Sequence, residues 1–150
     1  MAGTFTNLLY HLIFSTKHRL PSIVADLQPN LYEYMGGILR GEDGILLEIG
    51  GMADHVHLFV KFKPAKSVSE MLKIVKSKSS KWVNEEQSPS RRFSWQEGYA
   101  AFSVSESQAA SVRRYIRNQK AHHARQSYQD EFRAMLDRHG VAYDERYLWD

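Results

Sequence analysis

The clearest pattern of hydrophobic and polar positions is a strict alternation over residues 54–62. Successive residues of a β-strand face opposite sides of a sheet, so this alternation predicts a strand with two different faces. One face is entirely apolar and consists of Val56, Leu58, Val60 and Phe62. The other face carries His55 and His57, whose imidazoles would lie side by side. We therefore expect a strand that contributes one face to a core and presents a histidine pair on the other.

Three further segments have the patterns of strands. Residues 4–16 are mostly apolar on both faces, which predicts a central strand covered on both sides. Residues 45–49 alternate and are followed by Gly50-Gly51, which predicts a turn into the histidine strand and a hairpin. Residues 99–104 predict a fourth strand.

The segments between these strands have the patterns of helices. Asp26 is expected to cap a first helix that has Pro29 in its first turn, and the segment Ser67–Glu70 is a capping box for a second. A similar pattern at Ser105–Gln108 predicts a long third helix that continues to about Gln126. A short fourth helix is expected over residues 128–138, ended by Gly140.

The order strand, helix, strand, strand, helix, strand is that of the split βαβ, or ferredoxin-like, antiparallel sheet. The sequence thus predicts an α+β fold in which two crossover helices cover one sheet face. The third helix is then expected to cover the face that carries His55 and His57. A length of 150 residues, with 43% hydrophobic and 25% charged residues, predicts a single domain over residues 1–150.

Composition narrows the function classes. The chain contains no Cys, which excludes a disulfide framework and thiolate catalysis. It has neither an apolar run long enough to cross a membrane nor a signal-peptide pattern, so we expect a cytoplasmic protein. A net charge of +3 and a pI near 9.1 favour a polyanionic partner.

The third helix carries the candidate reactive group. Tyr115 and Gln119 are four residues apart and share a helix face. The helix as a whole is strongly basic and carries Arg113, Arg114, Arg117, Lys120 and Arg125. A phenol titrates near ~10 and needs activation at neutral pH. A divalent ion held by His55, His57 and the Gln119 amide would polarise a phosphodiester, and the oxygen ligand favours Mg²⁺ or Mn²⁺.

Each of these residues also has a plainer interpretation. A His-x-His pair alone is weak evidence for a metal site, and Tyr115 is one of eight tyrosines, most simply a packing residue. His122 and His123 diverge by about 100° on a helix, so we expect surface or DNA contacts from them. His11 is expected to pack near the histidine strand rather than to bind an ion. The lysines of the second helix are expected to be solvated.

Four basic residues are the candidate DNA contacts. Lys17 and Arg19 follow the first strand, where they could meet a DNA hairpin. Arg114 and Lys120 flank the tyrosine and glutamine on the third helix.

Taken together, these motifs resemble the HUH-type single-tyrosine transposases (TnpA-type) of the smallest bacterial insertion sequences. In that family HUH denotes His, bulky hydrophobe, His, which corresponds to His55-Val56-His57. The family's catalytic tyrosine lies on a late helix with a glutamine ligand four residues on, which corresponds to Tyr115 and Gln119. The segments 10–17 and 98–105 are also similar to the family, and the likeness covers nearly the whole chain.

The resemblance implies an enzyme, a metal-dependent DNA transposase. It would cleave and rejoin single-stranded DNA at insertion-sequence ends, recognised through hairpins, by a 5′-phosphotyrosine intermediate and without a nucleotide triphosphate. Tyr115 would be the nucleophile, and His55, His57 and Gln119 would bind Mg or Mn. The resemblance also implies a homodimer whose sites are completed in trans by the tyrosine helix. A bacterial cytoplasmic location, on the nucleoid when bound to DNA, is expected.

Three other functions remain open from the sequence. A domesticated relative would use the same chemistry on chromosomal hairpin repeats, and flanking DNA rather than the chain would distinguish it. A non-catalytic nucleic-acid-binding module on a ferredoxin-like sheet would be indifferent to metal chelation. A metal-dependent hydrolase would use water and leave no covalent intermediate.

Overall fold

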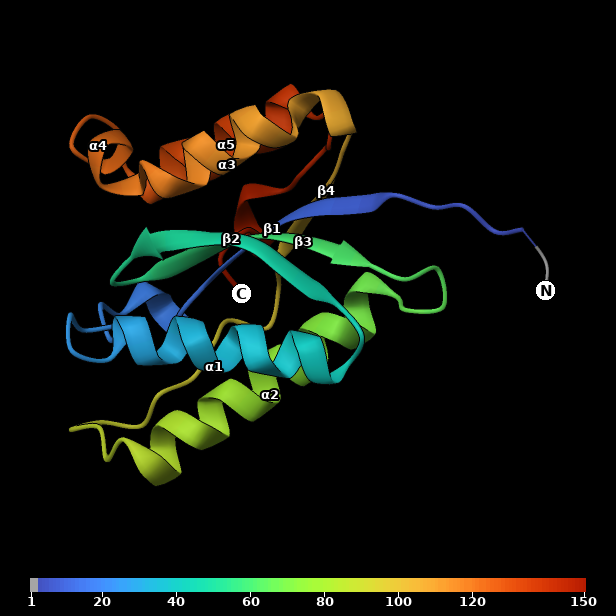
Figure 1. Cartoon of the computed structure of the whole chain (residues 1–150). Helices are drawn as coiled ribbons and strands as arrows, with labels where there is room; N and C mark the ends of the chain where they lie inside the picture. Colours follow the sequence, from blue (N-terminus) through green and yellow to red (C-terminus); the bar gives the residue numbers. More distant parts are fainter. Residues whose placement is uncertain (1–2) are drawn as a thin grey trace.

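A four-stranded antiparallel sheet separates two helical layers in the computed structural model, which describes residues 3–150 (Figure 1). The strands are β1 (Leu8–Ser15), β2 (Ile45–Met52), β3 (His55–Phe62) and β4 (Ala100–Val104). Their order across the sheet is β2-β3-β1-β4, and every neighbouring pair is antiparallel. This order confirms the predicted α+β, ferredoxin-like arrangement.

The strand β1 is central because it has apolar residues on both faces. It pairs with β3 on one side and with β4 on the other. Leu12 and Phe14 belong to the core beneath the sheet, whereas Ile13 packs on the opposite face with Phe102 and the C-terminal helices. The register sets Ile13 opposite His57 and Ser15 opposite His55, so the histidine pair lies beside β1, toward the end of the sheet at which β3 begins.

The first helical layer consists of α1 (Gln28–Gly41) and α2 (Val68–Glu86), which lie together under one sheet face (Figure 1). The predicted cap of α2 is confirmed, since Ser67 Oγ accepts a hydrogen bond from the Glu70 amide at 3.2 Å. The predicted cap of α1 is wrong. The residue before that helix is Leu27, which is itself helical in φ and ψ, and the helix start has no side-chain cap. Pro29 lies in the first turn, where its missing N–H has no intrahelical acceptor to lose.

The hairpin of β2 and β3 turns at Ala53-Asp54, so the predicted turn at Gly50-Gly51 is wrong. These glycines lie within β2, opposite His57 and Val56. The reason for glycine at position 50 is a close approach of backbones. A Cβ atom there would lie 2.2 Å from the carbonyl oxygen of Ile116, on the first helix of the opposite layer. At position 50 the backbone of that helix therefore comes closer to the sheet than any side chain would allow.

We expect Gly50→Ala to destabilise the fold by about 2 kcal/mol, because overpacking against fixed backbone costs roughly 1–3 kcal/mol. The matched control is Gly37→Ala in α1, where the new Cβ would meet only the end of the Arg40 side chain at 3.6 Å. That change is expected to be neutral or to stabilise by up to ~1 kcal/mol. Urea unfolding of both variants measures the difference, and equal losses of stability would contradict the close approach.

The second layer consists of α3 (Ala109–Arg117), α4 (Gln119–His123) and α5 (Tyr128–Arg138), which cover the histidine face of the sheet (Figure 1). The predicted fourth helix is confirmed as α5. The predicted continuous third helix is wrong, because Asn118 leaves helical geometry with φ −98° and ψ 28° and separates α3 from α4. This break leaves Asn118 exposed and buries Gln119 beside the sheet.

The predicted cap at Ser105 is also absent. Its hydroxyl lies 3.0 Å from the Ser107 hydroxyl instead, and Glu106–Gln108 form a 3₁₀ turn ahead of α3. Within residues 3–150, no helix combines the length and the apolar character needed to span a bilayer.

Candidate metal centre and tyrosine helix

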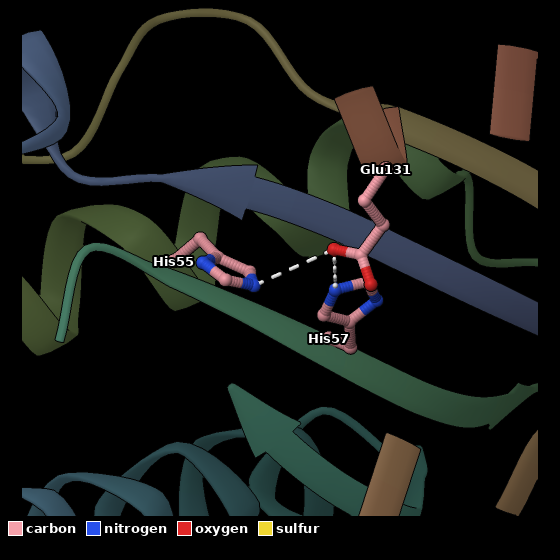
Figure 2. Close-up of side chains that lie close together, drawn as sticks. All are labelled: His55, His57 and Glu131. Atoms are coloured by element: carbon pink, nitrogen blue, oxygen red, sulfur yellow. Dashed lines mark hydrogen bonds and ion pairs between the residues drawn. The ribbon is translucent and has the colours of Figure 1, made fainter. Parts of the chain in front are cut away.

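The histidine pair of β3 lies under the second helical layer and is fully buried. Glu131 of α5 reaches down to both rings (Figure 2). Its Oε1 atom is 3.0 Å from His57 Nε2 and 3.6 Å from His55 Nε2. One ligand atom from each of the three residues lies within 4.8 Å of the others, which is the spacing of a shared divalent ion.

Gln119, the first residue of α4, joins this group. Its Oε1 is 3.0 Å from His55 Nε2, and its Nε2 donates to Glu131 Oε2 at 3.1 Å. The side chain is buried. The structure therefore brings together His55, His57 and Gln119, the three residues that the sequence suggested as ligands.

Tyr115 lies one turn before Gln119, on α3, and its side chain is half-buried. The phenol donates a hydrogen bond to Glu131 Oε2. Its ring lies edge-on to His57, with ring centroids 5.9 Å apart. The phenol thus lies at the histidine pair of its own chain rather than against a closed apolar surface.

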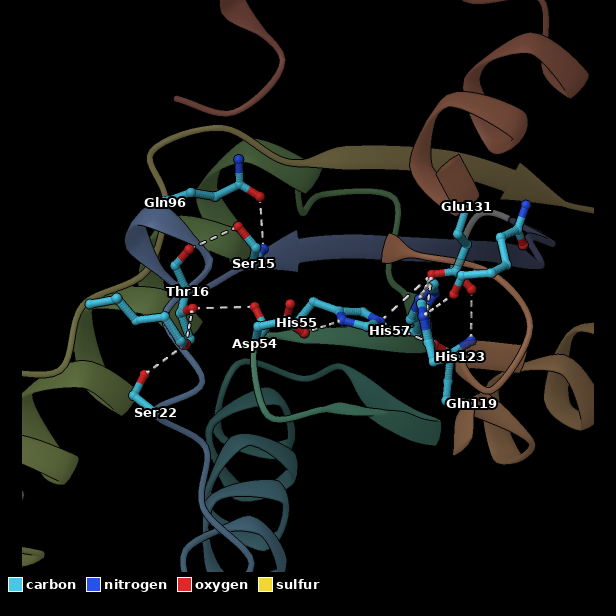
Figure 3. A network of polar contacts seen from close by, with 12 residues as sticks. Ser15, Thr16, Ser22, Asp54, His55, His57, Gln96, Gln119, His123 and Glu131 are labelled. Carbon is cyan, nitrogen blue, oxygen red and sulfur yellow. Dashed lines mark hydrogen bonds and ion pairs between the residues drawn. The ribbon is translucent and has the colours of Figure 1, made fainter. Parts of the chain in front are cut away.

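The outer nitrogens of both imidazoles are held by hydrogen bonds. His57 Nδ1 is 2.8 Å from His11 Nε2, and His55 Nδ1 is 2.8 Å from the Asp54 carboxylate. A carboxylate only accepts, so His55 donates from Nδ1 and its Nε2 lone pair faces Gln119 and Glu131. Figure 3 shows the polar network that links this site with the end of β1. His11 therefore packs behind the pair, as predicted.

Glu131 was missed by the sequence reasoning, although a signal was present. The apolar stripe of α5 is formed by Tyr128, Phe132, Met135 and Leu136, and position 131 falls within it. A carboxylate on a buried helix face needs a partner, because an isolated buried charge is very costly. The stripe predicts a buried acid, but no sequence pattern says that its partners are on β3.

The prediction for His123 is also wrong. It was expected at the surface or on DNA, but its Nε2 is 3.0 Å from Gln119 Oε1 and 3.2 Å from Glu131 Oε1. The expectation assumed one continuous helix, and the break at Asn118 changes the direction in which residue 123 faces. His122 is half-buried and lies on the Tyr115 ring, with ring centroids 4.4 Å apart.

The electrostatics of the cluster favour a cation. Burial lowers the pKa of His57 to about 4, against the opposing effect of Glu131, so this imidazole is neutral at pH 7. Burial by itself would raise the pKa of Glu131, but hydrogen bonds from His57, Tyr115 and Gln119 hold that pKa well below its ordinary value. The centre therefore contains an ionised carboxylate among nitrogen and amide donors. Two imidazoles with carboxylate and amide oxygens fit a divalent metal.

The surroundings of Tyr115 disfavour loss of its phenol proton. Burial and the hydrogen bond to Glu131 raise the pKa of Tyr115 above its ordinary value, while Gln119 and the Arg138 guanidinium act in the opposite direction. The phenol is therefore protonated at neutral pH while it faces the free carboxylate. A cation beside that carboxylate would oppose the effect by which Glu131 keeps the phenol protonated.

The lowered pKa of His57 predicts how the metal-free protein responds to acid. The unfolded chain takes up this proton near pH 6.5 and the folded chain only near pH 4, so the free energy of unfolding falls as pH drops between these values. A gap of about 2.5 pH units at about 1.4 kcal/mol each amounts to about 3.5 kcal/mol, of which about 2.8 kcal/mol is lost by pH 4.5. Urea unfolding in the presence of a chelator, at pH 7 and at pH 4.5, measures the loss. An equal loss in His57→Gln would contradict the assignment.

The four basic residues suggested as DNA contacts do not form one patch with the cluster. Lys17 is exposed, and Arg19 lies over the Trp149 ring with its guanidinium carbon 5.0 Å from the centroid. Arg114 is exposed on α3. Lys120 is exposed beside Gln119 and lines a groove between α4 and β2.

A buried His-x-His strand, a tyrosine helix and a ferredoxin-like sheet define the class of HUH nucleic-acid enzymes that the sequence resembles. The model of the family described as "Transposase IS200 like" matches residues 4–119. The chain therefore belongs to the IS200-like transposase family.

Curated relatives agree with this assignment. The ISDra2 transposase TnpA of Deinococcus radiodurans is 28% identical over 124 residues, which cover 78% of this chain and 87% of the relative. The transposase for insertion sequence element IS200 of Salmonella typhimurium is 26% identical over 125 residues, which cover 79% and 81% of the two chains.

Solved structures share the fold. The crystal structure of a candidate transposase from Deinococcus radiodurans R1 superposes with a TM-score of 0.61 at 26% identity, covering 79% of this chain and 95% of the other. A REP-associated tyrosine transposase bound to a REP hairpin has the same TM-score at 10% identity, covering 82% and 74% of the two chains, and shows similarity of fold alone.

Proposed function

We propose that this transposase cleaves and rejoins single-stranded DNA at the ends of an insertion sequence, with Tyr115 as the nucleophile. In the first step the phenol oxygen bonds to phosphorus and the bond to the 3′ oxygen breaks. The phenol gives up its proton and the leaving 3′ oxygen takes one up, so the products are a 5′-phosphotyrosine and a free 3′-hydroxyl. A 3′-hydroxyl of a second strand then attacks the phosphotyrosine and releases Tyr115. The observation that supports this most is the phenol's hydrogen bond into the cluster of His55, His57 and Glu131.

His55, His57, Glu131 and Gln119 are the residues that would hold a divalent ion, and two oxygen donors favour Mg or Mn. Such an ion, when bound, supplies positive charge that polarises the phosphodiester and neutralises Glu131. The chain's own residues do the positioning. Asp54 and His11 fix the imidazoles, and the short turn from Tyr115 to Gln119 keeps the phenol next to the ligands.

We further propose that residues 1–150 act as a single domain, in the bacterial cytoplasm and on the nucleoid when bound to DNA. The DNA is expected to carry hairpins, with Lys17, Arg19, Arg114 and Lys120 as contacts. A homodimer with sites completed in trans stays a prediction. Exchange would require residues 103–107 to redirect α3, which in the single chain already lies at its own histidine pair.

The test is incubation of the protein with single-stranded DNA that contains the candidate ends, with Mg²⁺ or Mn²⁺, followed by denaturing electrophoresis. A covalent protein–DNA species that needs the metal supports the proposal. Cleavage without any covalent species would support a hydrolase that uses water. Binding that is unaffected by chelation and leads to no cleavage would support a non-catalytic module.

A further inference from the structure

A second hollow, lined by both polar and apolar side chains, lies beside Tyr115, away from the metal ligands. It is a cavity of about 570 Å³ between β4, α3 and α5. Ser111 and Tyr115 line it from α3, Ser103 from β4, and Arg138 and His139 from the end of α5. Its volume is within the range of small-molecule sites, about 300–1,000 Å³.

The cavity is chemically suited to an anion with hydrogen-bonding groups. Hydroxyl, amide and imidazole groups line it beside the apolar side chains of Val104, Val112 and Met135, and within residues 3–150 its lining includes neither Asp nor Glu. Arg138 is its one arginine or lysine. In the part of the chain that the structure describes, the other arginines near the C-terminus are paired: Arg133 with Glu145 and Arg146 with Asp144. The exposed Arg138 guanidinium has no hydrogen-bond or ion-pair partner among the same residues.

The position of the cavity relates it to the reaction centre. Ser111, Tyr115 and Gln119 follow one another at four-residue steps. The first two line the cavity, and the third belongs to the metal centre. A strand that runs from the cavity to the metal centre would therefore pass the phenol. The α5 side of the cavity also lies outside residues 4–119, the segment matched by the family model.

We propose that this cavity binds the nucleotide next to the scissile phosphate of the single-stranded DNA, with Arg138 contacting a backbone phosphate. The inference rests on the proposed function and adds a substrate-positioning residue from α5. Ser111 offers its hydroxyl to the sugar or base, while the guanidinium holds the phosphate through charge-assisted hydrogen bonds. The cavity thereby sets which phosphate stands opposite Tyr115.

The test compares Arg138→Gln with Arg92→Gln, which removes the same charge from an exposed loop on the other side of the sheet. Binding of fluorescein-labelled oligothymidylate is measured by anisotropy over a range of salt concentrations. We expect Arg138→Gln to weaken binding about tenfold and to reduce the slope of log affinity against log salt by about 0.7, the value for one phosphate contact on a single strand. Arg92→Gln should change the slope much less.

A second variant addresses the cavity without changing charge. Ser111→Trp fills it from an exposed position on α3, one turn before Tyr115. It should weaken oligothymidylate binding while Mn²⁺ affinity stays within about twofold, since Ser111 is not among the ligands. Wild-type adduct formation, assayed in parallel, separates the two hypotheses. A covalent adduct together with unchanged binding and salt slope in Arg138→Gln would contradict nucleotide binding in the cavity but not the proposed function. Absence of the adduct would overturn the proposed function.

Discussion

Tyr115→Phe is expected to lower covalent adduct formation with single-stranded DNA by at least ~1,000-fold while DNA affinity stays within about twofold, because the substitution deletes only the nucleophilic oxygen. The ring remains to pack against His57 and His122. Glu131 loses one donor but keeps those of His57 and Gln119. Denaturing electrophoresis measures the adduct, and anisotropy measures binding.

The matched control is Tyr128→Phe. Tyr128 stacks on His55 with ring centroids 4.2 Å apart, so it is as near the centre as Tyr115. Its hydroxyl is buried and has no hydrogen-bond partner among the described residues, and it makes no contact with Glu131 of the kind that Tyr115 makes. The Phe variant should retain the adduct. Loss of the adduct in Tyr128→Phe together with its retention in Tyr115→Phe would reverse the assignment.

His57→Ala is expected to reduce Mn²⁺ affinity by more than about 100-fold and to remove adduct formation, because it deletes a donor atom and not merely a supporting contact. His11→Gln should have a smaller effect, about tenfold to 100-fold, since His11 only orients the ligand from behind. Isothermal titration calorimetry with Mn²⁺ measures the affinities.

His18→Asn is the control for the histidine series. His18 is exposed in the 3₁₀ turn Lys17–Arg19, with φ 58°, a conformation that Asn accepts well. It should leave Mn²⁺ affinity unchanged. Because His57→Ala also leaves Glu131 with one partner fewer in a buried place, circular dichroism must first establish that the variant is folded. Unchanged Mn²⁺ binding in a folded His57→Ala protein would contradict the ligand assignment.

The charges around Glu131 link the two predictions, the loss of adduct in Tyr115→Phe and the loss of Mn²⁺ affinity in His57→Ala. At neutral pH the cluster contains an ionised Glu131 and a neutral His57, and the same carboxylate holds the Tyr115 phenol. A phosphodiester brought to this place would meet negative charge. A divalent ion at the ligands would reverse that repulsion, which is why metal binding and adduct formation are expected to be lost together.

The sequence predicted those parts of the fold that depend on local periodicity. The alternation over residues 54–62 correctly placed Val56 in the core and the two imidazoles on the opposite face. The apolar faces of residues 4–16 correctly made β1 central. These predictions succeed because the period of a strand and the burial of its two faces are visible in a single segment.

The parts that failed depend on contacts between segments. Gly50 suggested a turn, yet it is needed because the backbone of Ile116 packs on it. Asn118 interrupts an otherwise helical pattern and thereby turns Gln119 and His123 to the site. Glu131 is recognisable as a buried acid from its place in the α5 stripe, but its contact with β3 is visible only in three dimensions.

The most direct measurement is the identification of the residue that carries the DNA. The covalent species formed with Mn²⁺ can be digested with protease and nuclease, and the nucleotide-bearing peptide identified by mass spectrometry. The account predicts a single modified peptide with the nucleotide phosphate on Tyr115 and a free 3′-hydroxyl on the released strand. A nucleotide on Tyr128 or on any other residue, or a 3′-phosphate on the released strand, would contradict it.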